Sequence, residues 1–242
     1  MLLTQKTLSE GCRMLAAYTA RQLDLEHDCS AAKRRAALLI PIVKAFFTDC
    51  GQEVASLGVQ LYGGHGFIRE WGMEQLMRDS RITQLYEGTN GIQALDLIRR
   101  KLLGDDGAEL NALIDELATQ VAQATSHAAL AERVGQRLQE WRLLADSVLQ
   151  ACHRDPQEIG AVSVDFLAYS AYVLLAALWL QAAERASQAL AAGSGEPAFY
   201  RAKLQSADFY LRRVLPRANA HREALLAGAD CLMAMPEADF AF

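Results

Sequence analysis

Helical periodicity runs through almost every long segment of this 242-residue chain, and the alternating pattern of β-strands is nearly absent. In residues 2–23, for example, Leu8, Leu15 and Leu23 lie near helical spacing, with glutamine, lysine and arginine between them. No repeat of roughly 33–47 residues, the period of helical solenoids, is visible. We therefore predict an all-α protein built as two packed helical bundles.

Glycine, proline and capping residues divide this pattern into segments. The predicted helices cover 2–23, 30–40, 41–62, 73–81, 91–103, 108–127, 129–153, 157–192, 197–214 and 218–233. Ser30 is the predicted N-cap of the second helix. Pro41 lacks an amide hydrogen and is predicted to open a new helix. Asn90, with Gln93 three positions on, resembles a capping box.

The turn-forming run GDDG at 104–107 is the best candidate for a domain boundary. Basic side chains slightly outnumber acidic ones before it, whereas acidic ones predominate after it. We therefore predict domains at 1–104 and 105–242. The first domain is the better candidate to meet an anionic partner, although two solvated surfaces of different composition explain the asymmetry equally well.

Composition excludes several classes of protein. Hydrophobic residues make up 52% of the chain and charged residues 22%, which is typical of a packed core and not of a disordered chain. The net charge of −5 disfavours a nucleic-acid partner. The five cysteines are scattered, without a CxxC or a Cys/His ligand spacing, so we predict no metal site, no disulfide framework and a reducing, cytoplasmic location.

The most apolar run is FLAYSAYVLLAALWL at 166–180. A helix that crosses a membrane needs about 20 apolar residues, so we predict a buried bundle helix here and no membrane span. The N-terminus reaches the polar residues Thr4, Gln5 and Lys6 before any apolar stretch develops, and no secretory signal is visible.

Residues 60–93 depart most from the helical pattern. Three glycines within positions 63–66 allow tight turns or a close approach of the backbone to a ligand. The segment has neither the Lys-Ser/Thr of a P-loop nor the preceding strand of a dinucleotide fold. Glu87 lies in a glycine-containing connector before a helix, which makes it a candidate catalytic carboxylate. From spacing alone, a helix-start carboxylate favoured by the macrodipole is the simpler interpretation.

The motifs GGHGF, MRD and YEGT occur in this order within that segment. Through them, residues 1 to about 103 closely resemble the C-terminal helical domain of flavin-dependent acyl-CoA dehydrogenases, which implies a four-helix-bundle-like first domain. The runs DFLAYSAYVLLAALWL and FYRAKLQSADFYLRRVLP in the second part are similar to the subfamily with an extra C-terminal helical domain, which includes 3-methylthiopropionyl-CoA dehydrogenases.

The resemblance implies α,β-desaturation of an acyl-CoA thioester. Glu87 occupies the position of the base that removes the pro-R α-proton, while hydride leaves the β-carbon for N5 of FAD. Burial of this carboxylate against flavin and acyl chain raises its basicity. The backbone N–H of Glu87 corresponds to a donor of the oxyanion hole, and Gly88 lets the thioester approach the backbone.

Six cofactor-binding positions are implied, in two groups. Those that match residues touching the flavin of the same subunit are Thr89, Asn90 and Gly91. Those that match residues contacting the ADP half of FAD in the neighbouring subunit are Gln60, Gly63 and Gly64. The family often has glutamine at the position of Gly91, so no side-chain contact is expected there. FAD is thus expected to bridge a dimer interface, in a homodimer or tetramer.

Other polar residues admit a structural interpretation. His65 is better explained by hydrogen bonds within its loop than by contact with a ligand. Arg78 and Asp79 are predicted to form an ion pair that fixes the glycine loop relative to YEGT. Asp165 is expected to cap a helix or pair within the second bundle.

The N-terminal helical domain and central β-domain of the family are not found in this sequence. We therefore expect a part of a longer enzyme, inactive alone, or a separately encoded subunit. The expected partners are acyl-CoA, those domains, an electron-transfer partner and further copies of the chain. The alternative is a noncatalytic helical domain for oligomerisation or assembly that kept the motif by descent.

Overall fold

The computed structural model describes residues 1–241, and within that range every element is helical. This confirms the all-α class. The helices that form the body of the molecule are α1 (Leu2–Leu25), α2 (Ser30–Tyr62), α6 (Ala108–Ala122), α7 (Ala128–Arg154), α8 (Glu158–Ala191), α9 (Pro197–Phe209) and α10 (Ala218–Leu226). The remaining α-helices are α3 (Gly64–Phe67), α4 (Met73–Ile82), α5 (Asn90–Asp96) and α11 (Asp230–Met233). A π-helical stretch extends α5 over Leu97–Leu102, and another extends α9 over Tyr210–Val214.

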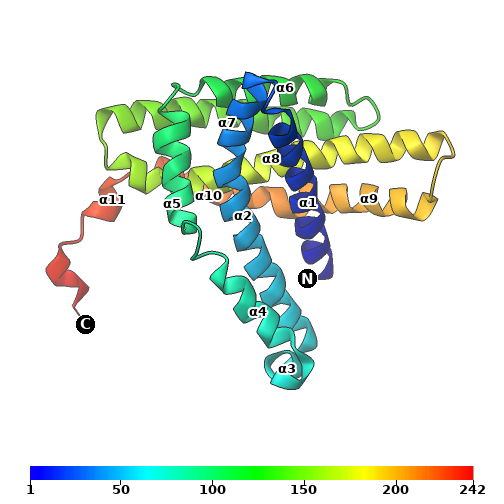
Figure 1. Cartoon of the computed structure of the whole chain (residues 1–242), viewed down its shortest axis with the longest axis horizontal. Coiled ribbons are helices and arrows are strands. Elements are labelled where there is room, and N and C mark those ends of the chain that lie inside the picture. Colours follow the sequence, from blue (N-terminus) through cyan, green and yellow to red (C-terminus); the bar gives the residue numbers. More distant parts are fainter. Residues whose placement is uncertain (242) are drawn as a thin grey trace.

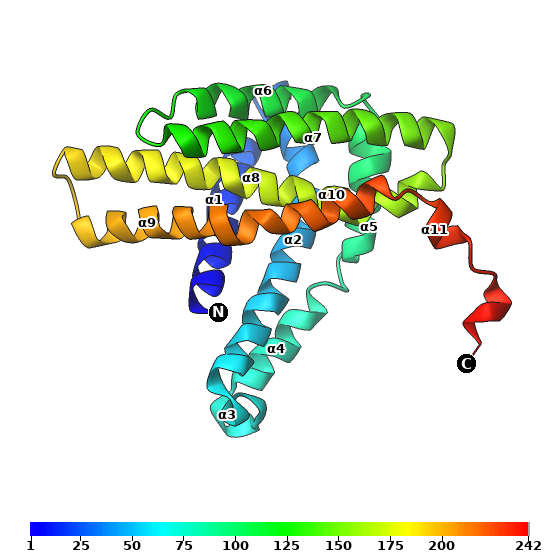
Figure 2. The same cartoon turned by 180° about the vertical axis from the view of Figure 1, so that it is seen from behind.

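The helices form two crossing groups. Helices α6 to α10 run along the long axis of the molecule, and α1, α2 and α5 cross them on one face (Figure 1). Figure 2 shows the same layer from behind, with α7 to α10 in front. Helix α2 continues beyond the layer and, together with α3 and α4, forms a projecting arm (residues 51–82). The motif-rich segment of the sequence therefore lies mostly on this arm.

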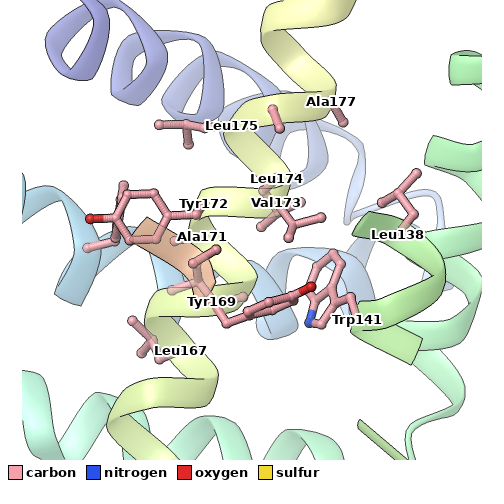
Figure 3. Packing of buried hydrophobic residues seen from close by; sticks show 14 of the residues in the cluster. Leu138, Trp141, Leu167, Tyr169, Ala171, Tyr172, Val173, Leu174, Leu175 and Ala177 are labelled. Atoms are coloured by element: carbon pink, nitrogen blue, oxygen red, sulfur yellow. The ribbon is translucent and has the colours of Figure 1, made fainter. Parts of the chain in front are cut away.

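Helix α8 forms the centre of the core because it is apolar on nearly every side. Its most apolar 18-residue window is 78% buried, which favours a core helix over a membrane span. Tyr169 of α8 lies beside Trp141 of α7 (Figure 3). The Tyr169 hydroxyl donates to Glu140 at 2.6 Å and the Trp141 Nε1 donates to Ser170 at 2.9 Å, so both buried rings satisfy their polar ends.

One buried cluster extends across the predicted boundary at 104/105. It contains Leu39 and Ile98 from the first part and Leu113 and Leu174 from the second. The GDDG run is a tight turn, with φ of 51° at Asp106 and left-handed backbone at the following glycine. The turn is present as expected, and the division into two domains there stays a prediction.

Three predictions about helix starts are wrong. Pro41 lies inside α2, whose full length is 33 residues. The helix continues through it because Pro41 is buried and α2 has buried residues on both sides of it. Ser30 is the first helical residue and Cys29 occupies the N-cap. Thr89, and not Asn90, caps α5, since its Oγ1 accepts a hydrogen bond from Ile92 N at 3.3 Å.

Candidate active site

The connector between α4 and α5 (residues 83–89) is a compact turn that presents Glu87. Glu87 and Gly88 both have left-handed backbone, with φ of 55° and 85°. This conformation is strained for glutamate and natural for glycine. Asn90 N donates to Gln84 O at 3.2 Å and thereby joins the two ends of the turn. The sequence EG thus reverses the chain and leaves Glu87 at its outer bend.

Glu87 is exposed, as are parts of its apolar neighbours Leu85 (49%), Tyr86 (49%) and Ile92 (56%). The burial of Glu87 that the resemblance implies is therefore not supplied by residues 1–241. Glycine is favoured at position 88 by its φ of 85°, a backbone conformation that side chains rarely adopt. An exposed carboxylate on a segment that also exposes apolar side chains is a surface that a further layer can cover.

Asn90 uses its side chain within the chain. Its Oδ1 accepts from Lys44 Nζ at 3.0 Å, and its Nδ2 donates to Asp49 Oδ1 at 2.7 Å. Thr48 Oγ1 and Ala45 O also lie within hydrogen-bond distance of this amide. Sequence reasoning missed these α2 residues because they lie more than 40 positions away and form no motif with YEGT.

The second group of predicted cofactor residues lies at the tip of the arm. Gln60 is in the last turn of α2, Gly63 has φ of 59°, and Gly64 begins α3. Helix α4 separates this tip from the connector (Figures 1 and 2). The structure therefore places the six predicted cofactor residues in two separate locations on one chain.

The backbone at these positions is open to a ligand. A Cβ added at Gly63, Gly64 or Gly91 would meet no atom within 4 Å. These three positions therefore leave room for a ligand, and the assignment of the six residues to FAD stays a prediction. Within residues 1–241, no group of three His, Cys, Asp or Glu side chains is arranged to hold a metal ion.

Gly66 differs from the open glycines of the same loop. A Cβ at Gly66 would lie 2.3 Å from Val59 O, so Gly66→Ala is expected to force α3 away from α2 and cost about 1–3 kcal/mol. Gly64→Ala is the matched control and should change stability little. Urea unfolding of the two variants measures the difference, and equal midpoints would contradict this role of Gly66.

The other polar predictions have mixed outcomes. Arg78 pairs with Glu74 at 2.9 Å, so the predicted pair with Asp79 is wrong. Positions four apart share a helix face, whereas adjacent ones do not. His65 packs edge-on against Trp71, with ring centroids 5.1 Å apart, and within residues 1–241 its side chain forms no hydrogen bond, so the predicted hydrogen bonds within the loop are wrong. Asp165 Oδ1 lies 2.8 Å from His221 Nδ1, within hydrogen-bond distance. This contact confirms the prediction that Asp165 has a partner within the second part of the chain.

Two family models match this chain. One, described as the C-terminal domain of acyl-CoA dehydrogenase, matches residues 1–103. The other, described as acetyl-CoA dehydrogenase C-terminal like, matches residues 110–236. The chain belongs to the acyl-CoA dehydrogenase family. The recognition from GGHGF, MRD and YEGT is thus confirmed.

Curated relatives agree with this family assignment. A 3-methylmercaptopropionyl-CoA dehydrogenase of Ruegeria pomeroyi is 38% identical over 96% of the chain and 41% of its own length. A broad-specificity linear acyl-CoA dehydrogenase, FadE5 of Mycobacterium tuberculosis, is 30% identical over 99% of the chain and 42% of its own length. The chain therefore spans about two fifths of the length of these acyl-CoA dehydrogenases.

A solved structure supports the fold. The acyl-CoA dehydrogenase of Bacillus anthracis, complexed with FAD, superposes with a TM-score of 0.72 at 17% identity. The match covers 93% of this chain and 41% of that one. At this identity the likeness concerns the fold, which in both cases is the helical arrangement described above.

Proposed function

We propose that this chain is the part of an FAD-dependent acyl-CoA dehydrogenase that supplies the catalytic base. One observation carries the proposal: Glu87 has left-handed backbone at an exposed bend, in a chain that matches this family on both sides of residue 104. Backbone strain of this kind is concentrated at functional sites, because the surrounding structure must maintain it.

Glu87 has two roles in this proposal. Its carboxylate removes the α-proton of the acyl-CoA thioester, and its backbone N–H donates to the thioester oxygen as negative charge develops there. Within residues 1–241, no backbone carbonyl accepts a hydrogen bond from that N–H, so it is available for the substrate. Covering the connector with the central domain would bury the carboxylate and exclude water.

FAD, when bound, supplies the acceptor for the hydride that leaves the β-carbon. Thr89 and Gly91 are the proposed contacts with the flavin of the same subunit, alongside the backbone of Asn90. Gln60, Gly63 and Gly64 are the proposed contacts with the ADP half of FAD held by a second subunit. The separation of the connector from the arm tip supports a cofactor shared between two copies.

Coexpression with the N-terminal helical and central β-domains of the family tests this function. The expected product is a complex with flavin absorbance that reduces an artificial electron acceptor when an acyl-CoA is added. A stable complex without flavin and without acyl-CoA oxidation would instead support the noncatalytic assembly role.

A further inference from the structure

The side chain of Asn90 lies between two opposite charges on α2. Lys44 Nζ is 3.0 Å from its Oδ1, and Asp49 Oδ1 is 2.7 Å from its Nδ2. An asparagine amide matches this pair because it presents an acceptor to the cation and a donor to the anion. Hydrogen bonds to charged groups are stronger than those between neutral groups. The contact is therefore a specific attachment of α5 to α2.

The same carboxylate also holds the other end of the connector. Gln84 Nε2 donates to Asp49 Oδ1 at 2.5 Å, while the backbone N–H of Asn90 donates to Gln84 O at 3.2 Å. Ser80 Oγ donates to Gln52 Oε1 at 2.8 Å one turn further along α2. Both ends of the connector are thus fixed to α2. Glu87 lies between them, and within residues 1–241 its side chain forms no hydrogen bond or ion pair.

We propose that Asn90 and Asp49 form a clamp that positions Glu87, so that Asn90 is a positioning residue whose side chain serves α2 and not the flavin. The inference rests on the proposed function for its catalytic consequence, but the clamp itself is a property of the chain. Rigid placement matters because a displaced base loses the near-attack geometry on which proton transfer depends.

Swapping the side chains of Asn90 and Asp49 tests the clamp. Asn90→Asp keeps the shape, removes the donors and places a carboxylate against Asp49, so backbone amides of the connector and the first turn of α5 should exchange with deuterium at least about tenfold faster. Adding Asp49→Asn restores a donor–acceptor pair and should return the exchange rates toward those of the parent. Asn219→Asp, at an exposed position of α10, introduces the same charge and should leave the connector unchanged.

Deuterium exchange of the backbone amides of α8 reports the global stability of the chain. Faster exchange in the connector with unchanged exchange in α8 indicates a loosened connector and not an unfolded chain. Unchanged exchange of the connector in Asn90→Asp, or no recovery in the double variant, would overturn the clamp. The completed enzyme is the chain coexpressed with the N-terminal helical and central β-domains of the family. In it, the clamp predicts a lower kcat for the Asn90→Asp variant at unchanged flavin content, and recovery of kcat in the double variant. Loss of flavin in Asn90→Asp, without faster exchange, would indicate that Asn90 contacts the cofactor instead. Failure of the proposed function is a separate result, because the exchange measurement needs neither FAD nor substrate.

Discussion

In the completed enzyme, Glu87→Gln is expected to reduce the rate of acyl-CoA desaturation by about 10²–10⁴-fold, the usual contribution of a general base. Glutamine keeps the size of the side chain and the left-handed turn at Glu87, but it cannot accept the α-proton. FAD should remain bound, because the proposed flavin contacts lie at other positions. Stopped-flow measurement of flavin bleaching after mixing with acyl-CoA records the step directly.

Glu196→Gln is the matched control for this substitution. Glu196 is exposed at the start of α9, and in the described part of the chain its side chain forms no capping hydrogen bond with that helix. The flavin of the Glu196→Gln variant should bleach at the parental rate after mixing with acyl-CoA. Bleaching by Glu87→Gln within a factor of two of the control would show that another group is the base.

The largest effect on stability is expected from Arg35→Met, which should lower the free energy of unfolding by about 3–5 kcal/mol. Arg35 is 8% exposed, and it donates to Glu109 at 2.7 Å, to Glu116 at 2.5 Å and to the Tyr18 hydroxyl at 3.0 Å. Removing it leaves Glu109, itself 8% exposed, without its buried partner. Burial raises the pKa of Tyr18 to about 12, so its hydroxyl stays protonated and donates to Glu116.

Arg34→Met is the control on the same helix. Arg34 pairs with the same Glu109 at 3.3 Å, but its side chain is 60% exposed, and exposed pairs contribute about 0–1 kcal/mol. Urea unfolding followed by circular dichroism compares the two variants. Similar midpoints for Arg34→Met and Arg35→Met would contradict the view that burial makes this network important.

The same network connects the two regions that the family models match. Arg35 lies on α2, which continues into the arm, whereas Glu109 and Glu116 lie on α6, beyond the predicted boundary. Together with the buried cluster that crosses residue 104, these ion pairs indicate that α6 and α8 support α2. A rigid α2 is what the clamp of Asn90 and Asp49 requires, because Asp49 lies on this helix.

Periodicity was sufficient for most of the fold because the helices are long and amphipathic. The all-α class and the burial of residues 166–180 follow from local patterns of apolar side chains. Pro41 shows the limit of local rules: a proline usually interrupts a helix, but here packing along the whole of α2 outweighs the lost hydrogen bond. The wrong prediction of the N-cap of α5 has a related cause. The Asn90 side chain forms hydrogen bonds with α2, and Thr89 caps α5 in its place.

The candidate site was less accessible to sequence reasoning. Spacing alone did not distinguish Glu87 from a helix-start carboxylate, and the motif YEGT was needed to select it. The left-handed backbone at Glu87 and the contacts of Asn90 with Asp49 depend on tertiary structure. The pair of Arg78 with Glu74, four positions apart, could have been predicted from helix geometry.

Exchange of the substrate α-protons with D2O tests the central claim most directly, because it isolates the base from hydride transfer. The completed enzyme should be incubated in D2O with an acyl-CoA that has no β-hydrogen and therefore cannot transfer hydride. Incorporation of deuterium at the α-carbon is then followed by NMR. We predict exchange with the parent and with Glu196→Gln, and its loss with Glu87→Gln at equal flavin content. Exchange at the parental rate in Glu87→Gln would contradict the assignment of Glu87 as the base.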